Sequence, residues 1–149
     1  TQGCEEILSE INLDGFSKVF VSCGTGTTIA GMANHLSKNN ITDIELCGIQ
    51  VLKGENYIAN DIKELYGVTN AIVYDEYHSG GYAKTNTELI GFIKDFTAET
   101  GVLLDPIYTG KMMLAIKKLI DSKGISQGEK IMAIHTGGLT GWFGKASEL

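Results

Sequence analysis

The sequence contains little proline, little cysteine and little clustered positive charge, and each shortage excludes a class of protein. One proline and three cysteines occur among 149 residues, and no two cysteines form a C-x-x-C pair. This usage is typical of reduced thiols in a cytosolic protein and not of a disulfide framework. The three histidines have neither H-x-x-x-H spacing nor a neighbouring cysteine, so the sequence predicts no metal site.

Basic residues are outnumbered by acidic ones, with twelve Lys+Arg against eighteen Asp+Glu and a formal net charge of -6. No basic run is dense enough to follow a phosphate backbone, so we expect no nucleic-acid partner. No stretch approaches the roughly 20 apolar residues that cross a bilayer, so we expect no membrane segment. We therefore expect a cytoplasmic protein whose 43% hydrophobic content builds one sizeable core.

Helical and strand patterns alternate along the chain. Helices are predicted over 4–11, 28–38, 57–67, 86–101 and 111–124, and the first and last of these are amphipathic. Strands are predicted over 18–22, 43–51, 70–77 and 129–138, and an extended segment over 101–110. Apolar strands separated by helices indicate a parallel sheet that is covered on both faces. We predict an α/β fold with a doubly wound, mainly parallel sheet in three αβα layers, as a single domain over 1–149.

Polar, glycine-bearing turns follow the strands and the extended segment. They are SCGTGTT at 22–28, EYHSGGYAK at 76–84, DPIYTGK at 105–111 and HTGG at 135–138. In a parallel sheet the loops at the carboxyl ends of the strands meet the positively polarised N-termini of the following helices. We expect these four turns to converge on one ligand site.

The first turn has the composition of an anion site. Gly24 and Gly26 allow close approach to backbone N–H groups, and the hydroxyls of Thr25, Thr27 and Thr28 add donors. An uncharged loop of this kind suits a phosphate group that is held by amides. A structural βα turn without a ligand is the alternative, because glycine turns are common in α/β folds.

Two nucleotide motifs do not fit this turn. A G-x-G-x-x-G/A fingerprint needs glycine or alanine where the chain has Ile29, and the acid expected after the next strand is replaced by Gln50 or Val51. A P-loop needs G-K-[ST], and no lysine lies in the turn. The sequence therefore favours a phosphate that does not belong to a dinucleotide or a nucleoside triphosphate.

Four motifs, SCGTGTTIAGM, YDEYHSGGYAKTNTEL, LDPIYTGKMM and IHTGG, occur in this order over nearly the whole chain. Together they resemble the pyridoxal-phosphate-dependent family of 1-aminocyclopropane-1-carboxylate deaminase and D-cysteine desulfhydrase. The resemblance implies the tryptophan-synthase-β-like fold, called fold type II. It also implies pyridoxal 5'-phosphate as cofactor, with its phosphate in the loop from Gly24 to Thr28.

The resemblance also implies roles for single residues. Tyr108 would lie beside the cofactor ring, where its phenol can stack or assist proton transfer, and Thr109 would face the pyridine nitrogen. Tyr82 matches a second tyrosine near the substrate, and Thr136, with His135, would line the same pocket. Ordinary packing with a bonded hydroxyl is the alternative for either tyrosine.

Position 109 separates the two activities of this family. The deaminases carry glutamate there, and a carboxylate keeps the pyridine nitrogen protonated, which makes the ring a deep electron sink. The chain has Thr109, whose neutral hydroxyl favours a weaker sink that suffices for β-elimination of thiolate. The sequence therefore resembles a desulfhydrase more than a cyclopropane-opening deaminase, and the resemblance implies an amino acid as its small-molecule substrate.

The family's Schiff-base lysine, in a segment resembling GGNKxRK, has no counterpart in this chain. We therefore expect the chain to be the C-terminal, cofactor-phosphate-binding part of a longer enzyme, which family resemblance suggests is a homodimer, and to be inactive alone. A non-catalytic pyridoxal-phosphate- or anion-binding domain and a lone enzyme that uses Lys111 are the alternatives. Lys111 and Lys84 lie in the turns, and we expect a structural or surface role for Lys111, because most lysines are exposed.

Overall fold

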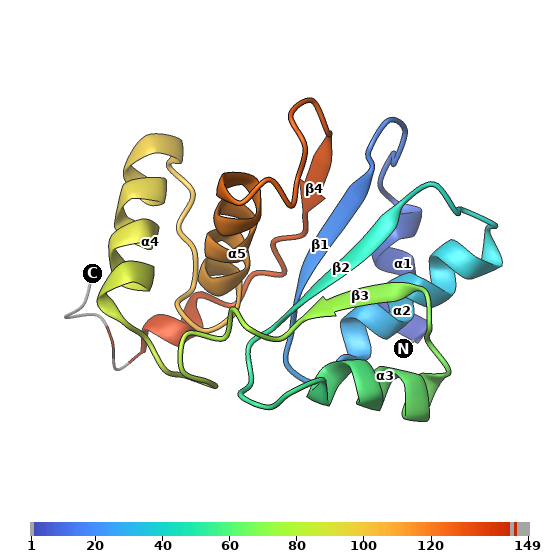
Figure 1. Ribbon diagram of the computed structural model, residues 1–149, viewed down its shortest axis with the longest axis horizontal. Coiled ribbons are helices and arrows are strands. Elements are labelled where there is room, and N and C mark those ends of the chain that lie inside the picture. The colour runs from blue at the N-terminus through green and yellow to red at the C-terminus, as the bar shows by residue number, and fades with distance from the viewer. Residues whose placement is uncertain (1, 144, 146–149) are drawn as a thin grey trace.

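The alternation of helices and strands that the sequence predicts is present in the structure. The computed structural model describes residues 2–143 and 145. The elements are α1 (Gln2–Ser9), β1 (Lys18–Cys23), α2 (Thr27–Lys38), β2 (Glu45–Gln50), α3 (Tyr57–Tyr66), β3 (Ala71–Tyr74), α4 (Thr87–Thr100), α5 (Thr109–Asp121), β4 (Ile131–Ala133) and the short 3₁₀ helix η1 (Leu139–Trp142) (Figure 1).

All four strands run parallel, in the order β3-β2-β1-β4. Phe20 in β1 stands in register with Cys47 of β2 on one side and Ala133 of β4 on the other. The chain therefore adds β2 and β3 on one side of β1 and returns to add β4 on the opposite side. This reversal makes the carboxyl ends of β1 and β4 a topological switch point, where crevices form in open α/β sheets.

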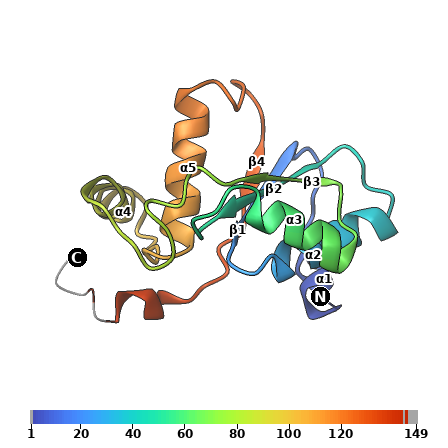
Figure 2. The same cartoon turned by 60° about the horizontal axis from the view of Figure 1, so that its bottom comes forward.

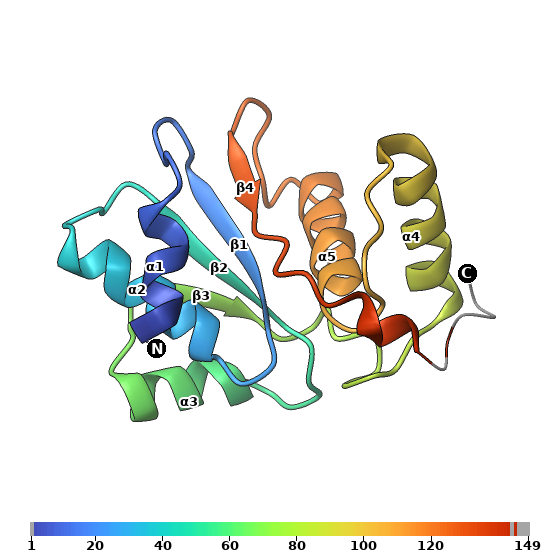
Figure 3. The same ribbon diagram turned by 180° about the vertical axis from the view of Figure 1, so that it is seen from behind.

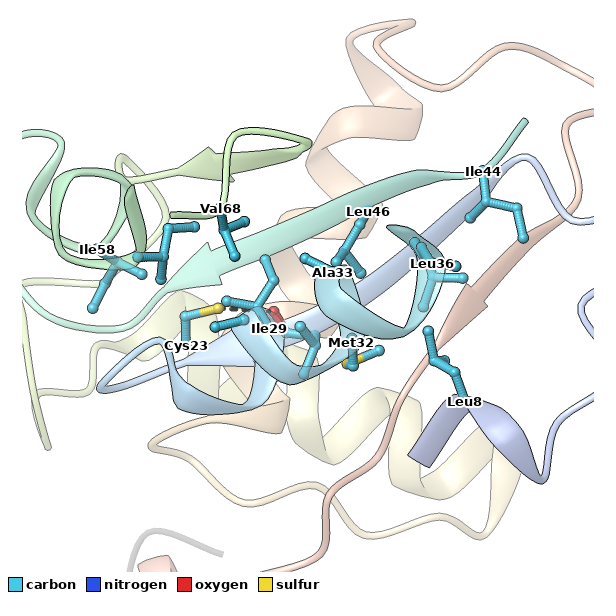
Figure 4. Close-up of a cluster of buried hydrophobic side chains, with 14 residues drawn as sticks. Leu8, Cys23, Ile29, Met32, Ala33, Leu36, Ile44, Leu46, Ile58 and Val68 are labelled. Atoms are coloured by element: carbon cyan, nitrogen blue, oxygen red, sulfur yellow. Dashed lines mark hydrogen bonds between the residues drawn. The ribbon is translucent and has the colours of Figure 1, made fainter. Parts of the chain in front are cut away.

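Helices cover both faces of the sheet, which confirms the predicted α/β layers. Figure 2 shows α1, α2 and α3 on one side of the strands and α5 on the other. Figure 4 shows the first of these interfaces, where apolar side chains of α2 pack on β1, β2 and the neighbouring helices. The labelled side chains are Leu8, Cys23, Ile29, Met32, Ala33, Leu36, Ile44, Leu46, Ile58 and Val68.

The opposite face of the sheet packs on α5. Phe20 and Ile49 lie buried against Met112 and Ala115 of this helix. The strands β1 and β2 are therefore apolar on both faces, which explains their near-continuous hydrophobic sequences. Helix α4 packs on α5 instead of on the sheet and extends the molecule sideways (Figure 1).

Several predicted boundaries are wrong in extent. The predicted strands 70–77 and 129–138 shorten to four and three residues, because their polar halves form loops at the edge of the sheet. The predicted helix 111–124 begins earlier, at Thr109, and ends at Asp121. The helix predicted over 4–11 spans Gln2–Ser9. Within the part of the chain that the structure describes, no helix has the length and apolar character needed to cross a bilayer.

Candidate functional site

A cavity of about 310 Å³ lies at the switch point between β1 and β4. Its volume falls at the lower end of the range for small-molecule pockets. The segment after β4 runs toward the N-terminal end of α5, where η1 lies (Figure 3). Except for Ile29, which follows the first turn, the lining residues come from three of the four predicted turns: Ser22, Cys23, Gly24, Thr25, Gly26, Thr27, Thr28, Ile29, Tyr108, Thr136, Gly137 and Gly138.

The first turn presents the N-terminus of α2 to this cavity. Gly26 occupies the position before the helix with a left-handed φ of 76°, and it has no side chain to cap the N-terminus. A β-carbon at Gly26 would stand 2.5 Å from Ile62 Cγ2, so the turn requires glycine for its conformation and for its close packing on α3. The first-turn N–H groups of a helix lack intrahelical acceptors, and they attract an anion.

The threonine hydroxyls of the turn add polar atoms beside these amides. Thr25 is exposed, and its hydroxyl lies 3.1 Å from that of Thr27. Thr27 also lies 3.4 Å from the hydroxyl of Tyr66 on α3. Thr28 lines the cavity from the first turn of the helix. The predicted cofactor-binding residues from Gly24 to Thr28 therefore all border one cavity, with amide and hydroxyl donors and no charged side chain.

Tyr108 forms the opposite wall of the cavity, directly before α5. A β-carbon at Gly24 would stand 3.2 Å from Tyr108 Cε1, so the ring lies against the glycine backbone. The Tyr108 hydroxyl oxygen lies 3.5 Å from that of Tyr82, and the two rings meet edge to face with centroids 6.1 Å apart. Burial, reinforced by the contact with Tyr82, raises the pKa of Tyr108 to about 12. At neutral pH this phenol is therefore protonated.

Tyr82 reaches the site through this contact and does not line the cavity itself. Its side chain is 53% exposed. The turn that carries Tyr82 thus approaches the other three, as the parallel topology predicts. The catalytic roles of Tyr82 and Tyr108 stay predictions.

Thr109 lies beneath the site and is fully buried. Its hydroxyl donates to Asp105 Oδ2 at 2.8 Å and accepts from the Asp105 N–H at 3.0 Å. Thr109 does not line the cavity, because this reciprocal pair turns its hydroxyl toward Asp105. Its expected contact with a pyridine nitrogen stays a prediction.

Asp105 is a residue that the sequence reasoning missed. Its buried carboxylate accepts from the N–H groups of Ile107 and Tyr108, both at 2.8 Å, and of Thr109 at 2.9 Å. It therefore caps the beginning of α5 and fixes the backbone that carries Tyr108. The sequence contained a signal for this cap, because Asp105 stands four residues before Thr109, directly ahead of the helix predicted over 111–124.

Lys111 is buried, so of the two expected roles, structural or surface, the surface role is wrong. Its side chain is 0% exposed, and its Nζ donates to the carbonyl oxygen of Gly81 at 2.7 Å. Burial lowers the pKa of Lys111 to about 8, against the opposing influence of Asp105. The residue is enclosed because the 76–84 turn folds over the first turn of α5. Lys84, in that same turn, is exposed.

The last turn contributes Thr136 to the cavity, as expected, but not His135. The His135 ring lies 3.3 Å from the carbonyl oxygen of Leu103 and accepts from the Gly137 N–H at 3.1 Å. These contacts fix the turn after β4. His135 is therefore placed as a structural residue beside the site. Among the described residues, no group of three His, Cys, Asp or Glu side chains is arranged to hold a metal ion.

Comparison with known proteins supports a relationship over most of the chain. Residues 2–137 match the family model described as pyridoxal-phosphate dependent enzyme. A Pyrococcus horikoshii protein provisionally named 1-aminocyclopropane-1-carboxylate deaminase is 37% identical over 86% of this chain and 41% of its own length. A Thermotoga maritima protein with the same provisional name is 29% identical over 97% of this chain and 48% of its own. The D-cysteine desulfhydrase of Salmonella newport is 31% identical over 95% of this chain and 44% of its own.

Solved structures agree with the sequence relatives. A crystal structure of a homologue of 1-aminocyclopropane-1-carboxylate (ACC) deaminase superimposes with a TM-score of 0.74 at 32% identity, over 97% of this chain and 48% of that one. The processed form of threonine deaminase isoform 2 from Solanum lycopersicum superimposes with a TM-score of 0.58 at 14% identity, over 97% of this chain and 44% of that one, and shows the shared fold. The chain thus spans about half the length of the relatives it matches.

Proposed function

Because this chain belongs to the family of pyridoxal-phosphate dependent enzymes, we propose that it is the cofactor-phosphate-binding part of a longer lyase or deaminase. The observation that carries the proposal is the cavity at the switch point, which an uncharged turn and an uncapped helix N-terminus enclose. The cofactor of the family is pyridoxal phosphate. The substrate would be a small amino acid.

The residues present fit the phosphate group of this cofactor. A dianionic phosphate needs several N–H or O–H donors and a positive electrostatic potential, and a helix N-terminus supplies both. Gly24 and Gly26 expose backbone that a side chain would cover, and Thr25, Thr27 and Thr28 carry hydroxyls at the rim. The absence of charged side chains in the turn favours phosphate held by amides.

When bound, pyridoxal phosphate supplies an electron sink for the bonds of the amino-acid α-carbon. The chain's own contribution to the chemistry is Tyr108, whose protonated phenol stands at the cavity wall. Its hydroxyl can hold a proton for a leaving group or a carbanion, and Tyr82 orients it from outside the cavity. Asp105 and Thr109 fix the backbone below and offer no free carboxylate to the ring.

Within the family we infer D-cysteine desulfhydrase as the activity of the longer protein. Thr109 is neutral where the deaminases carry glutamate, so the ring nitrogen would lack a carboxylate partner. The reaction would convert D-cysteine and water into pyruvate, ammonia and sulfide. Its test is to incubate the longer protein with D-cysteine and, separately, with 1-aminocyclopropane-1-carboxylate. Sulfide release with the first is the expected result, and ammonia release with only the second contradicts the assignment.

A non-catalytic domain that binds pyridoxal phosphate or another anion is the second candidate. It is favoured by the composition of the cavity, whose described lining residues include no lysine to form a covalent bond with the cofactor aldehyde. The two candidates predict the same behaviour of the 149-residue chain alone. They differ in whether a longer protein that contains it turns over an amino acid.

The first experiment is to mix the 149-residue chain with pyridoxal phosphate and to record absorbance and intact mass before and after borohydride reduction. Reversible binding that inorganic phosphate weakens, without a reduced adduct, is the expected result. Thr25→Glu, which adds a negative charge to the exposed rim, should abolish it, and Thr69→Glu, at an exposed site away from the cavity, should not. A reduced adduct on Lys111 would show that the chain holds its own catalytic lysine and would overturn the proposal.

A further inference from the structure

The turn that carries Tyr82 has an unfavourable backbone conformation. The backbone φ angle is 53° at Ser79, 95° at Gly80, 118° at Gly81 and 54° at Ala83. Residues other than glycine rarely adopt positive φ angles. Tyr82 stands between two of these positions. A turn of this kind persists when contacts outside it support it. Such contacts are therefore required to hold the Tyr82 ring in place.

Lys111 supplies one of these contacts from the first turn of α5. Its Nζ lies 2.7 Å from the carbonyl oxygen of Gly81, which also accepts from the Lys84 N–H at 3.1 Å. The ammonium group thus binds the carbonyl that closes the turn, next to Tyr82. Both Lys111 and Gly81 are buried, so little water competes for this hydrogen bond. Helix α5, which begins directly after Tyr108, therefore also holds the turn that presents Tyr82.

We propose that Lys111 is a positioning residue, whose ammonium group holds the 79–83 turn on α5 and thereby keeps Tyr82 against Tyr108. The contact does not depend on any ligand. Its importance for turnover rests on the proposed function, in which Tyr108 faces the substrate. Burying an amine costs desolvation free energy, which an apolar side chain of equal length would avoid while filling the same space. We therefore attribute the lysine at this position to the hydrogen bond that it donates to Gly81.

Charged neighbours act on the Lys111 ammonium in opposite directions. Asp105 favours its protonated form, whereas burial and Lys145 disfavour it. Its pKa of about 8 leaves the ammonium form predominant at pH 7. The strong, charge-assisted form of the hydrogen bond to Gly81 is therefore the one present near neutral pH.

Hydrogen exchange of the unliganded chain tests the positioning role directly. The reporters are the amides of Gly80, Gly81 and Lys84, which are hydrogen-bonded inside the turn. Lys111→Met should raise their exchange rates about tenfold at pH 7 without changing those of α2. Lys117→Met is the matched control, because this lysine lies on the same helix, is exposed and pairs with Asp121. It should leave the turn unchanged.

A spectroscopic readout separates positioning from a general structural effect. Tyr82→Phe removes the partner hydroxyl of Tyr108 and should lower the pKa of Tyr108, measured by phenolate absorbance with Tyr108→Phe as reference. Lys111→Met should produce the same shift, and the double variant should add nothing to it. Lys111→Leu, which is apolar and also lacks a donor for the Gly81 carbonyl, takes the place of Lys111→Met if that variant does not fold.

A folded Lys111 variant with turn exchange equal to the wild type overturns the proposal. Additive shifts of the Tyr108 pKa in the double variant overturn it as well. Neither measurement uses pyridoxal phosphate, so both test the positioning role independently of the proposed function. Failure of the proposed function would appear separately, if the folded chain did not bind pyridoxal phosphate in competition with inorganic phosphate.

Discussion

The ring of Tyr108 lies against the backbone of Gly24, so that a β-carbon at position 24 would stand 3.2 Å from Cε1 and 3.5 Å from the hydroxyl oxygen. This contact joins the turn after β1 to the beginning of α5 across the switch point. The anion-binding turn and the proposed proton donor are therefore parts of one packed unit. A small change at Gly24 should therefore alter both anion binding by the turn and the position of the Tyr108 ring.

Gly24→Ala should weaken binding of pyridoxal phosphate about 3- to 10-fold while costing at most about 1 kcal/mol of stability, because the Tyr108 ring can shift by the few tenths of an ångström required. The measurements are a binding titration and chemical unfolding. Gly91→Ala is the control, since a β-carbon there meets no heavy atom within 4 Å. In the interior of α4 it should stabilise the chain by about 0.5–1 kcal/mol and leave binding unchanged. Unaltered binding by Gly24→Ala would contradict the packed unit.

Thr109→Val should destabilise the chain by about 1–3 kcal/mol, although the side chain keeps its shape. The substitution removes both the donor to Asp105 Oδ2 and the acceptor of the Asp105 N–H, in a place without exposure to water. Thr109→Ser, which keeps the hydroxyl, is the matched control. Equal stability of the valine and serine variants, measured by urea unfolding, would show that the reciprocal pair does not stabilise the beginning of α5.

Thr109→Glu should be more damaging, by about 3 kcal/mol or more at pH 7, because it places a second carboxylate beside buried Asp105. The introduced carboxyl would have a raised pKa in the folded state, so the variant should lose stability relative to the wild type as pH rises from 4 to 7. A pH series of unfolding curves measures this difference. A flat difference would mean that the new side chain reaches solvent or the cavity, and only then could it serve a cofactor nitrogen.

The three thiols should differ sharply in reactivity. Burial raises the pKa of Cys23 to about 12, and burial with the neighbouring Glu45 raises that of Cys47 to about 12. Cys4 is only partly buried. At pH 8 iodoacetamide should therefore modify Cys4 first in the folded chain, and the other two only after unfolding. Peptide mass spectrometry reads out the sites, and early labelling of Cys23 would show that the end of β1 opens.

Much of the fold could be predicted from the sequence, because β1 and β2 are buried on both faces and their apolar runs are visible without the structure. The anion-binding turn was equally visible, since its glycines and threonines directly follow a strand. The burial of Lys111 was not, because it depends on Gly81, 30 residues away in the sequence. The residues next to Lys111 in the sequence do not indicate that the distant 76–84 turn will cover it.

Asp105 and β4 illustrate two other limits of prediction. The carboxylate of Asp105 binds backbone amides, which have no signature in side-chain composition, so only its spacing to Thr109 could have indicated the cap. The apolar pattern after Glu129 correctly marked a strand. Its length could not be derived, because pairing with β1 over only three residues, and not propensity, limits β4.

The alkaline pH dependence of stability should reveal Lys111. Its pKa of about 8 lies well below the ordinary value of 10.5, so between these pH values the unfolded chain binds more protons than the folded one. The free energy of unfolding therefore gains a contribution that is absent below pH 8 and increases up to about pH 10.5. Relative to Lys111→Met, the wild type should gain on the order of 1–3 kcal/mol between pH 7 and 10.

The comparison with Lys111→Met is essential, because other groups act in the opposite direction over the same pH range. Cys23 and Tyr108 have raised pKa values, so they lose protons more readily in the unfolded chain, and their contribution falls as pH rises. Cys23 is present in both proteins and cancels in the difference. Because Lys111→Met should itself shift the pKa of Tyr108, both proteins are compared in a Tyr108→Phe background. The stability of the 79–83 turn should depend on pH differently from the global free energy of unfolding, because the neutral amine of Lys111 binds the Gly81 carbonyl more weakly than the ammonium does. Turn exchange, corrected for its intrinsic pH dependence, should therefore increase above pH 8 in the wild type even as the Lys111 contribution to global stability increases.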